Sequence, residues 1–170
     1  MKAPVAKLLE EKLKKLGYRQ IAEGLKDIGV DILLQLLDCR SIKIGNTAAD
    51  FLSRKGANSL VISAITKNEI KTKIGKIRAQ SILFGFGREK PEAMAAYLQL
   101  LQDRNDEVAY NSLLALVAWG DGRVIPAIKE RQATVKSKED AKGFLLACEA
   151  IEKSDMSIFS PHFSIDKNVW

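Results

Sequence analysis

Few side chains in this 170-residue sequence have the types and spacing that catalysis requires. Its single histidine, His162, lies in a proline-containing tail, so a Cys–His or Ser–His nucleophilic pair would form only if that tail folded into a pocket. Cys39 and Cys148 lie far apart in the apolar helical patterns LLDCR and LLACEA. We therefore expect a surface histidine, two buried free thiols rather than a disulfide or redox pair, and no catalytic residues.

Ligands for a metal, a phosphate or a cofactor are equally scarce. Neither cysteine has neighbours at metal-ligand spacing. The stretch FGFGREK holds Gly85 and Gly87, but it lacks the preceding strand and the Lys-Ser/Thr ending of a phosphate-binding loop, so we interpret it as a helix terminator. Asp103, Asp106 and Glu107 surround the turn QDRNDE, where carboxylates cap the helix that follows. No metal and no cofactor are expected.

Positive charge has the clearest consequence for binding. The formal net charge is +6 and the pI is near 9.3, which favours acidic partners such as nucleic acid or an acidic protein surface. The cations form three groups: Lys7, Lys12, Lys14, Lys15 and Arg19; Lys67, Lys71, Lys73, Lys76 and Arg78; Arg123, Lys129, Arg131, Lys136 and Lys138. The second and third groups would form a stripe suited to phosphates if they shared a face. Acidic residues interrupt them, however, and an aromatic fraction of 6% is low for base stacking.

Apolar residues that recur at helical spacing must position these side chains. The pattern runs through almost the whole chain, for example at Leu33, Leu34 and Leu37, and few stretches alternate with the period of a strand. It predicts an all-α protein. A hydrophobic fraction of 46% and a charged fraction of 28% are typical of a globular chain, and the length suits one domain with its own core.

Glycines divide the helical pattern into units. Gly29, Gly56, Gly87 and Gly120 each end an apolar run, at intervals of about 30 residues, and glycine tolerates the left-handed conformation that terminates helices. The predicted helix pairs lie at about 18–39, 43–67, 73–103 and 107–132, with capping helices at about 4–16 and 138–153. Stacked neighbours would bury apolar stripes that no pair could bury alone.

Superposing the second helices of the pairs predicts which positions face the core. Core positions are expected at Leu33, Leu60, Met94 and Val124; at Leu34, Val61, Ala95 and Ile125; and at Leu37, Ala64, Leu98 and Ile128. The position that looks away from the core is expected at Gln35, Ile62, Ala96 and Pro126. Residues 1–155 would form a single repeat domain, and the aromatic tail 156–170, which contains Phe159, Phe163 and Trp170, would pack on the last repeat.

The stretch NSLLALVAWGDGRVIPAIKE, within residues 107–132, resembles the short bacterial HEAT-like repeats known from phycobilisome-lyase-type proteins. An Ala- and Leu-rich first helix leads to a Gly-Asp corner, and Arg-Val-Ile-Pro opens the second helix. The resemblance implies a right-handed solenoid of antiparallel helix pairs with capping helices. It also implies that Asp121 caps the second helix, that Arg123 lies at its start and that Pro126 lies in or near its first turn. Armadillo and tetratricopeptide arrays stay open as alternatives.

An array of helix pairs without a catalytic set favours a non-catalytic protein-binding module, because the second helices of such arrays line a concave surface. The expected contact row is Ser59, Ile62, Ser63, Thr66, Gln99, Gln102, Arg123, Lys129 and Glu130. Our first hypothesis is a bacterial immunity or inhibitor protein, a monomer within its hetero-complex, that covers the active site of a toxin or enzyme. The positive charge would favour an acidic target surface.

Two other functions are considered. A basic solenoid could bind nucleic acid, as in the HEAT-like alkylpurine DNA glycosylases, although Trp119 and Trp170 do not supply the carboxylate-and-aromatic set of those enzymes. A lyase-like chaperone that holds a tetrapyrrole rests on fold analogy alone and ranks last. The apolar runs fall short of the roughly 18 residues that suggest a membrane span, and MKAPVAKLLEEKLKK lacks the uninterrupted core of a secretory signal, so we expect a cytoplasmic protein without a membrane partner.

Overall fold

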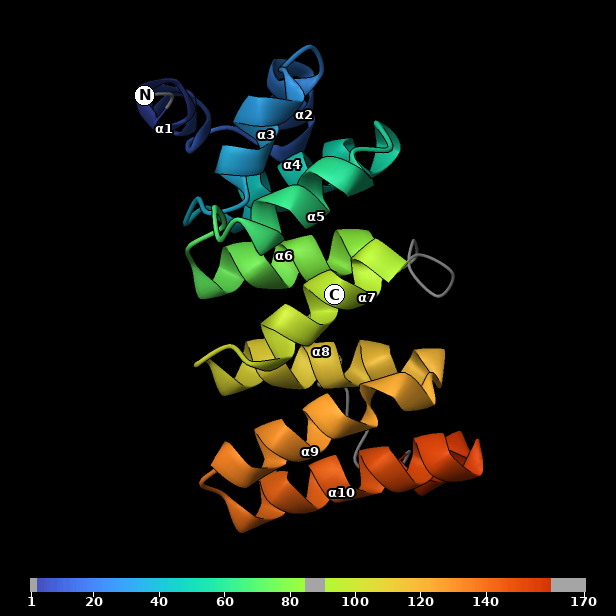
Figure 1. The fold of residues 1–170 in the computed structure, drawn as a ribbon. Coiled ribbons are helices and arrows are strands. Elements are labelled where there is room, and N and C mark those ends of the chain that lie inside the picture. Colours follow the sequence, from blue (N-terminus) through green and yellow to red (C-terminus); the bar gives the residue numbers. More distant parts are fainter. Residues whose placement is uncertain (1–2, 85–90, 160–170) are drawn as a thin grey trace. The chain divides into compact units, whose positions relative to one another are not determined.

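The computed structural model describes residues 3–84 and 91–159, and every regular element in these ranges is helical, as the apolar spacing predicts (Figure 1). The ten α-helices are α1 (Ala3–Leu13), α2 (Tyr18–Leu25), α3 (Val30–Leu36), α4 (Ile42–Arg54), α5 (Asn58–Thr66), α6 (Lys73–Phe84), α7 (Pro91–Leu101), α8 (Asp106–Trp119), α9 (Ile125–Thr134) and α10 (Lys138–Lys153). Two short 3-10 helices, η1 (Gly122–Val124) and η2 (Met156–Ile158), complete them. None of these helices combines the length and the apolar character that a membrane crossing needs.

The helices begin and end close to the predicted residues. The four predicted pairs correspond to α2 with α3, α4 with α5, α6 with α7 and α8 with α9, and α1 and α10 are the two predicted end helices. Gly56 and Gly120 adopt the left-handed conformation, with φ of 64° and 66°, as expected for glycines that end helices. Gly29 instead precedes α3 as its N-cap, with φ of −64°. Gly87 and its corner lie outside the described residues.

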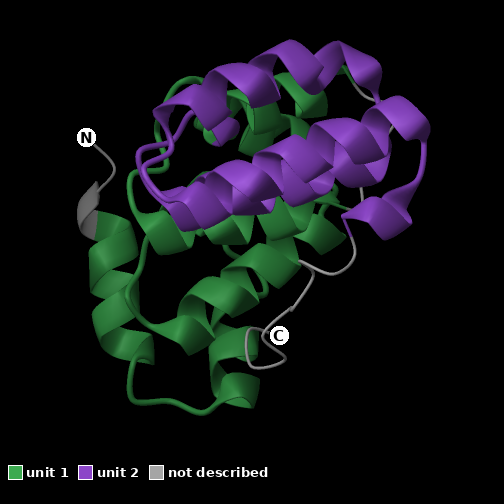
Figure 2. Cartoon of the chain, turned by 90° about the horizontal axis from the view of Figure 1, so that it is seen from below, with its two compact units in different colours: residues 1–100 green, residues 101–170 purple. Residues whose placement is uncertain are grey.

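The chain divides into two compact units, residues 1–100 and 101–170 (Figure 2). In unit 1, α1 packs on α2 and α3, α4 packs on α2, α3 and α6, and α5 packs on α6. In unit 2, α10 packs on α8, α9 and η2. Within each unit, helices thus pack mainly on helices that are close in sequence.

A buried arginine joins three helices of unit 1. Arg78 of α6 is 4% exposed, and its Nη1 donates to the carbonyls of Leu37 and Cys39, at 2.6 and 2.8 Å. Its Nη2 donates to the Ser41 carbonyl at 3.2 Å, and its Nε donates to the Asn46 side chain at 3.0 Å. These carbonyls follow the end of α3, where helical acceptors lack partners. Arg78 is therefore a structural residue, and its prediction as part of a basic surface group is wrong.

Asp38 forms the reciprocal contact. Its carboxylate accepts hydrogen bonds from the backbone N–H groups of Lys71 and Thr72, both at 2.9 Å, and from the Thr72 hydroxyl at 2.7 Å. These donors immediately precede the start of α6 at Lys73. The segment that follows α3 and the helix α6 therefore satisfy each other's backbone groups. A Cβ atom at Gly75 would overlap the Asp38 carboxylate, so the close approach requires glycine there.

Unit 2 contains the Gly-Asp corner on which the resemblance rests. The Asp121 carboxylate accepts from the Arg123 backbone N–H at 2.9 Å and so caps η1, which runs directly into α9. Pro126 lies in the first turn of α9, where no helical donor is lost. Val124 and Ile128 are fully buried, as predicted. The local chemistry of the corner thus follows the expected pattern.

The predicted core phase is wrong in α7 and only partly right in α5, where Val61 and Ala64 are buried as predicted. Leu60 is 52% exposed and Ala95 is also exposed, whereas Ile62 and Ala96 are buried. One residue rotates a helix by about 100°, so a one-residue error in superposition turns the predicted stripe away from the core. The buried residues of α7 are Ala93, Ala96, Tyr97, Leu100 and Leu101. In the second helix of the last pair, Ile125 is only half-buried.

Both thiols are buried, and so is Phe159, the first aromatic residue of the tail. Cys39 and Cys148 are free and buried, as predicted, and burial raises the pKa of each thiol. The segment Met156–Ile158 packs on α10, and Phe159, which follows it, is fully buried. Residues 160–170, which include His162 and Trp170, lie outside the described residues.

We predict that Ile128→Ala lowers the free energy of unfolding by about 2–5 kcal/mol, because the truncation leaves a cavity in the core of unit 2. Ile125→Ala is the matched control, and its smaller burial predicts a smaller loss. Urea denaturation followed by circular dichroism measures both values. Equal losses for the two variants would contradict the assigned core.

A pair of helical glycines tests the role of Arg78. A Cβ atom at Gly45 of α4 would overlap the Arg78 guanidinium, whereas a Cβ atom at Gly143 of α10 meets nothing within 4 Å. We predict that Gly45→Ala costs about 3 kcal/mol or more, because the displaced guanidinium leaves buried carbonyls without donors. Gly143→Ala should stabilise the protein by about 0.5–1 kcal/mol through helix propensity. Thermal unfolding measures the stability of both variants. An equal change in the midpoint temperature of the two variants would contradict the structural role of Arg78.

Candidate functional site

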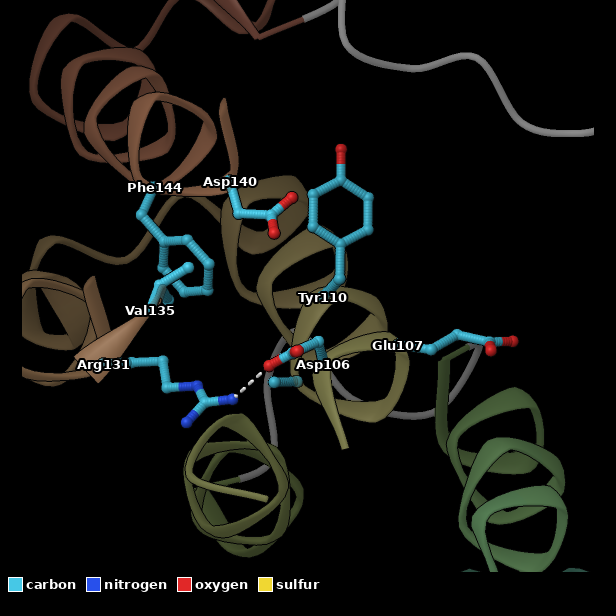
Figure 3. Close-up of a pocket in the computed structure, with 8 residues that line it drawn as sticks. Asp106, Glu107, Tyr110, Arg131, Val135, Asp140 and Phe144 are labelled. Carbon is cyan, nitrogen blue, oxygen red and sulfur yellow. Dashed lines mark hydrogen bonds and ion pairs between the residues drawn. The ribbon is translucent and has the colours of Figure 1, made fainter. Parts of the chain in front are cut away.

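A pocket in unit 2 lies where the first turns of α8 and α10 approach the end of α9 (Figure 3). The cavity has a volume of about 240 Å³. Its lining residues are Asp106, Glu107, Ala109, Tyr110, Arg131, Val135, Asp140 and Phe144. Three consecutive helices thus contribute apolar side chains and a rim of charged groups.

Helix capping explains why acidic side chains reach the rim. Asn105 caps α8 by accepting from the Val108 N–H at 3.2 Å, and Ser137 caps α10 by accepting from the Asp140 N–H at 3.3 Å. Acidic residues in a first turn stabilise the positive end of the helix dipole. Asp106 and Glu107 occupy the first turn of α8, and Asp140 occupies that of α10. The predicted capping role of the residues around QDRNDE fits this placement.

Two of the charged residues that line the pocket, Arg131 and Asp106, form an ion pair with each other. Arg131 Nη2 donates to the Asp106 carboxylate at 2.9 Å, and the Arg131 side chain is only 11% exposed (Figure 3). The Nε atom of Arg131 is buried and has no hydrogen-bond acceptor among the described residues. Tyr110 lines the opposite part of the pocket, and burial, followed by the nearby Asp140 carboxylate, raises the pKa of its hydroxyl.

The lining of this pocket combines apolar, aromatic and acidic side chains. Phe144, Val135 and Ala109 supply apolar contacts, Tyr110 supplies an aromatic ring, and carboxylates supply negative charge. Its lining residues include no serine, cysteine or histidine that would form a nucleophile–base pair. Among the residues that the structure describes, no group of three or more His, Cys, Asp or Glu side chains is arranged to hold a metal ion.

The predicted contact row is distributed over both units. Its members in unit 1 are Ser59, Ile62, Ser63, Thr66 and Gln99. Gln99 of α7 donates its Nε2 to the Ile65 carbonyl of α5 at 3.0 Å, so these two helices lie beside each other there. Ser59, Thr66 and Gln99 are exposed and Ser63 is half-buried. The prediction of Ile62 as a contact residue is wrong, because it lies on the buried side of α5 and is 8% exposed.

The members in unit 2 are Gln102, Arg123, Lys129 and Glu130, and all four are exposed. Gln102 donates to the Ala127 carbonyl of α9 at 3.2 Å. Arg123 forms an ion pair with Asp121 at 2.5 Å, and Lys129 Nζ lies 3.6 Å from a Glu152 carboxylate oxygen. Three cations of the third basic group therefore lie close to carboxylates of their own chain: Arg123, Lys129 and Arg131, which pairs with Asp106.

Sequence reasoning missed the pocket and part of the exposed face. Tyr110, Asp140 and Phe144 were not singled out, because the contact of α8 and α9 with the final helix leaves no local signal. Leu60 and Ala95 were assigned to the core but are exposed. The acidic first turns of α8 and α10 were visible in the sequence, although capping alone does not predict a cavity.

The ion pair at the Gly-Asp corner allows a titration test. Hydrogen bonds from the Arg123 side chain and backbone lower the pKa of Asp121 to about 2. Because this pKa is depressed, the contact stabilises the fold above the ordinary aspartate range and is lost as the pH falls towards 2. We predict that Arg123→Gln raises the Asp121 pKa towards its ordinary value, as measured by carboxyl-carbon NMR. An unchanged pKa would show that the backbone hydrogen bond alone depresses it.

Comparisons with protein-family models, with curated proteins and with solved structures found no match to this chain.

Proposed function

We propose that the chain is a non-catalytic protein-binding module built from HEAT-like helix pairs in a right-handed solenoid. The sequential packing of helices within each unit supports this proposal. So does the corner of the last repeat, where Gly120 is left-handed, Asp121 caps the following turn and Pro126 lies in the first turn of α9. Arrays of this type bind other chains through the exposed faces of their second helices.

An uncharged exposed face on α5 and α7 carries the proposal. The outer side of α5 carries Ser59, Leu60, Ser63 and Thr66. Gln99 of α7 lies next to α5, because its side chain donates to the Ile65 carbonyl. Ala95 is exposed one helical turn before Gln99 on the same helix. Interface cores are depleted in charged residues, whereas 28% of this chain is charged.

The first helix of the same pair shows that this lack of charge is local. The exposed positions of α4 include Lys43, Asp50 and Arg54, and Arg54 forms an ion pair with Asp50 at 2.9 Å. Such a surface is suited to solvent. The two helices of this pair thus differ in the chemistry of their exposed residues, and the difference favours α5 and its neighbour α7 as the side that meets a partner.

The partner that we propose is a toxin or enzyme whose active site the module covers, as an immunity or inhibitor protein does. The net charge of +6 supports a partner with an acidic surface, because long-range attraction raises the association rate. Within such a complex the uncharged face would form the dry centre of the interface. Lysines elsewhere on the chain would act during the approach.

The charge arrangement gives less support to nucleic-acid binding. Arg78, from the second basic group, is internal and donates to backbone carbonyls. In the third group, Arg123 and Arg131 form ion pairs with Asp121 and Asp106. These arginines are therefore occupied within the protein, and phosphates would have to compete with carboxylates for them.

We predict that Ser63→Arg weakens the binding of the partner by the full chain. The chain is first used as bait in a native lysate of its source cells, and a stoichiometric partner is identified and purified. Calorimetry should then show that Ser63→Arg weakens binding by roughly tenfold or more, because it places an unpaired charge in a dry interface. If the partner is an enzyme, the wild-type chain should inhibit it and Ser63→Arg should not.

Ser53→Arg on α4 is the matched control, because it adds the same charge at an exposed serine outside the proposed face. It should leave the affinity unchanged. Equal weakening by both variants, or the lack of any stoichiometric partner, would contradict the proposal. Tight binding to duplex DNA that falls steeply with added salt would favour the nucleic-acid function instead.

A further inference from the structure

We propose that the pocket of unit 2 binds the side chain of an arginine or lysine residue from a partner polypeptide. The pocket is the one formed by α8, α9 and α10 (Figure 3). This inference goes beyond the proposed function. It does not rest on the face of α5 and α7, which belongs to the other unit.

The size of the cavity suits a single side chain. Its volume of about 240 Å³ lies below the range of roughly 300–1,000 Å³ that is usual for small-molecule sites. Arginine and lysine have long, narrow apolar stems with a charged end. Phe144, Val135 and Ala109 would contact such a stem, while the charged end reaches the rim.

The charge of the lining selects a cation. Asp140 is exposed at the rim and takes part in no ion pair among the residues described, whereas Asp106 already binds Arg131. The Asp140 carboxylate lies between Phe144 and Tyr110 in the close-up of the pocket (Figure 3). A cation placed there would meet a carboxylate and an aromatic ring together, and both attract positive charge.

The small cavity indicates that the occupant is one side chain of a polypeptide, because its volume lies below the usual range for a free small molecule. The Nε atom of Arg131 takes no part in this site, because it has almost no accessible surface even when the cavity is empty. A residue within a polypeptide can also be held by contacts outside the cavity, whereas a simple diamine cannot.

The test uses three small probes with the isotope-labelled full chain, followed by NMR. N-acetyl-arginine-N-methylamide supplies a cation and carbonyls, the corresponding citrulline derivative replaces the guanidinium with a neutral urea, and putrescine supplies cations without a carbonyl. We expect saturable shifts of Tyr110, Asp140 and Phe144 with the arginine probe. The citrulline probe should bind at least roughly threefold more weakly, because it lacks the charge. Putrescine should also bind more weakly than the arginine probe.

Two adjacent acidic residues of α10 provide matched variants. Asp140→Asn should weaken binding of the arginine probe roughly two- to fivefold and remove its advantage over citrulline. Glu139→Gln, in the same turn but outside the lining, should leave binding unchanged. Circular dichroism verifies that each variant is folded, and Tyr110→Leu provides a second test by removing the aromatic ring.

Several outcomes would overturn the inference. These are the absence of saturable binding, equal affinity for arginine and citrulline, or equal losses in Asp140→Asn and Glu139→Gln. Tighter binding of putrescine than of the arginine probe would overturn the assignment to a polypeptide residue. None of these results depends on the fate of Ser63→Arg, so the two proposals can fail separately.

Discussion

The buried guanidinium of Arg78 is the constraint on which unit 1 depends. A charged group that is 4% exposed is tolerated only if acceptors surround it, and here three backbone carbonyls and the Asn46 side chain do so. Burial lowers the pKa of Arg78, because the loss of solvent disfavours the charged guanidinium. Because Asp38 in turn binds the backbone just before α6, the end of α3 and the beginning of α6 cannot shift independently.

This constraint extends to the helices that carry the exposed uncharged face. Once α6 is held, α5 packs on it, and the buried Tyr97 hydroxyl of α7 donates to the Gln80 carbonyl of α6 at 2.6 Å. The bond from Gln99 to the Ile65 carbonyl then joins α7 to α5. Both bonds end on backbone carbonyls, so Gln99 is the one exposed side chain that these two bonds use. A face that is held in this way loses little conformational entropy on binding.

Sequence reasoning located the helices, but it did not give the correct rotation of every helix. Helix ends depend on local chemistry, such as the left-handed Gly120 and the capping Asp121, and these signals were correctly interpreted. Rotation depends on which neighbour a helix packs against, so Leu60 was assigned to the core and Ile62 to the surface, and both assignments were wrong. Arg78 was taken for a surface cation because its acceptors lie more than 30 residues away in the chain. Hydrogen-bond partners that are distant in the chain produce no periodic pattern in the sequence.

Arg131 and Arg78 show how similar side chains acquire different roles. Both extend from helices towards the end of another helix and both are largely buried, yet all three nitrogens of Arg78 donate within the fold. Arg131 is bound to Asp106 at the rim and leaves its Nε without an acceptor beside a cavity. A fully satisfied guanidinium can only stabilise the fold. An incompletely satisfied one carries a free-energy cost, and the cavity beside Arg131 shows that the packing of α8, α9 and α10 is incomplete there.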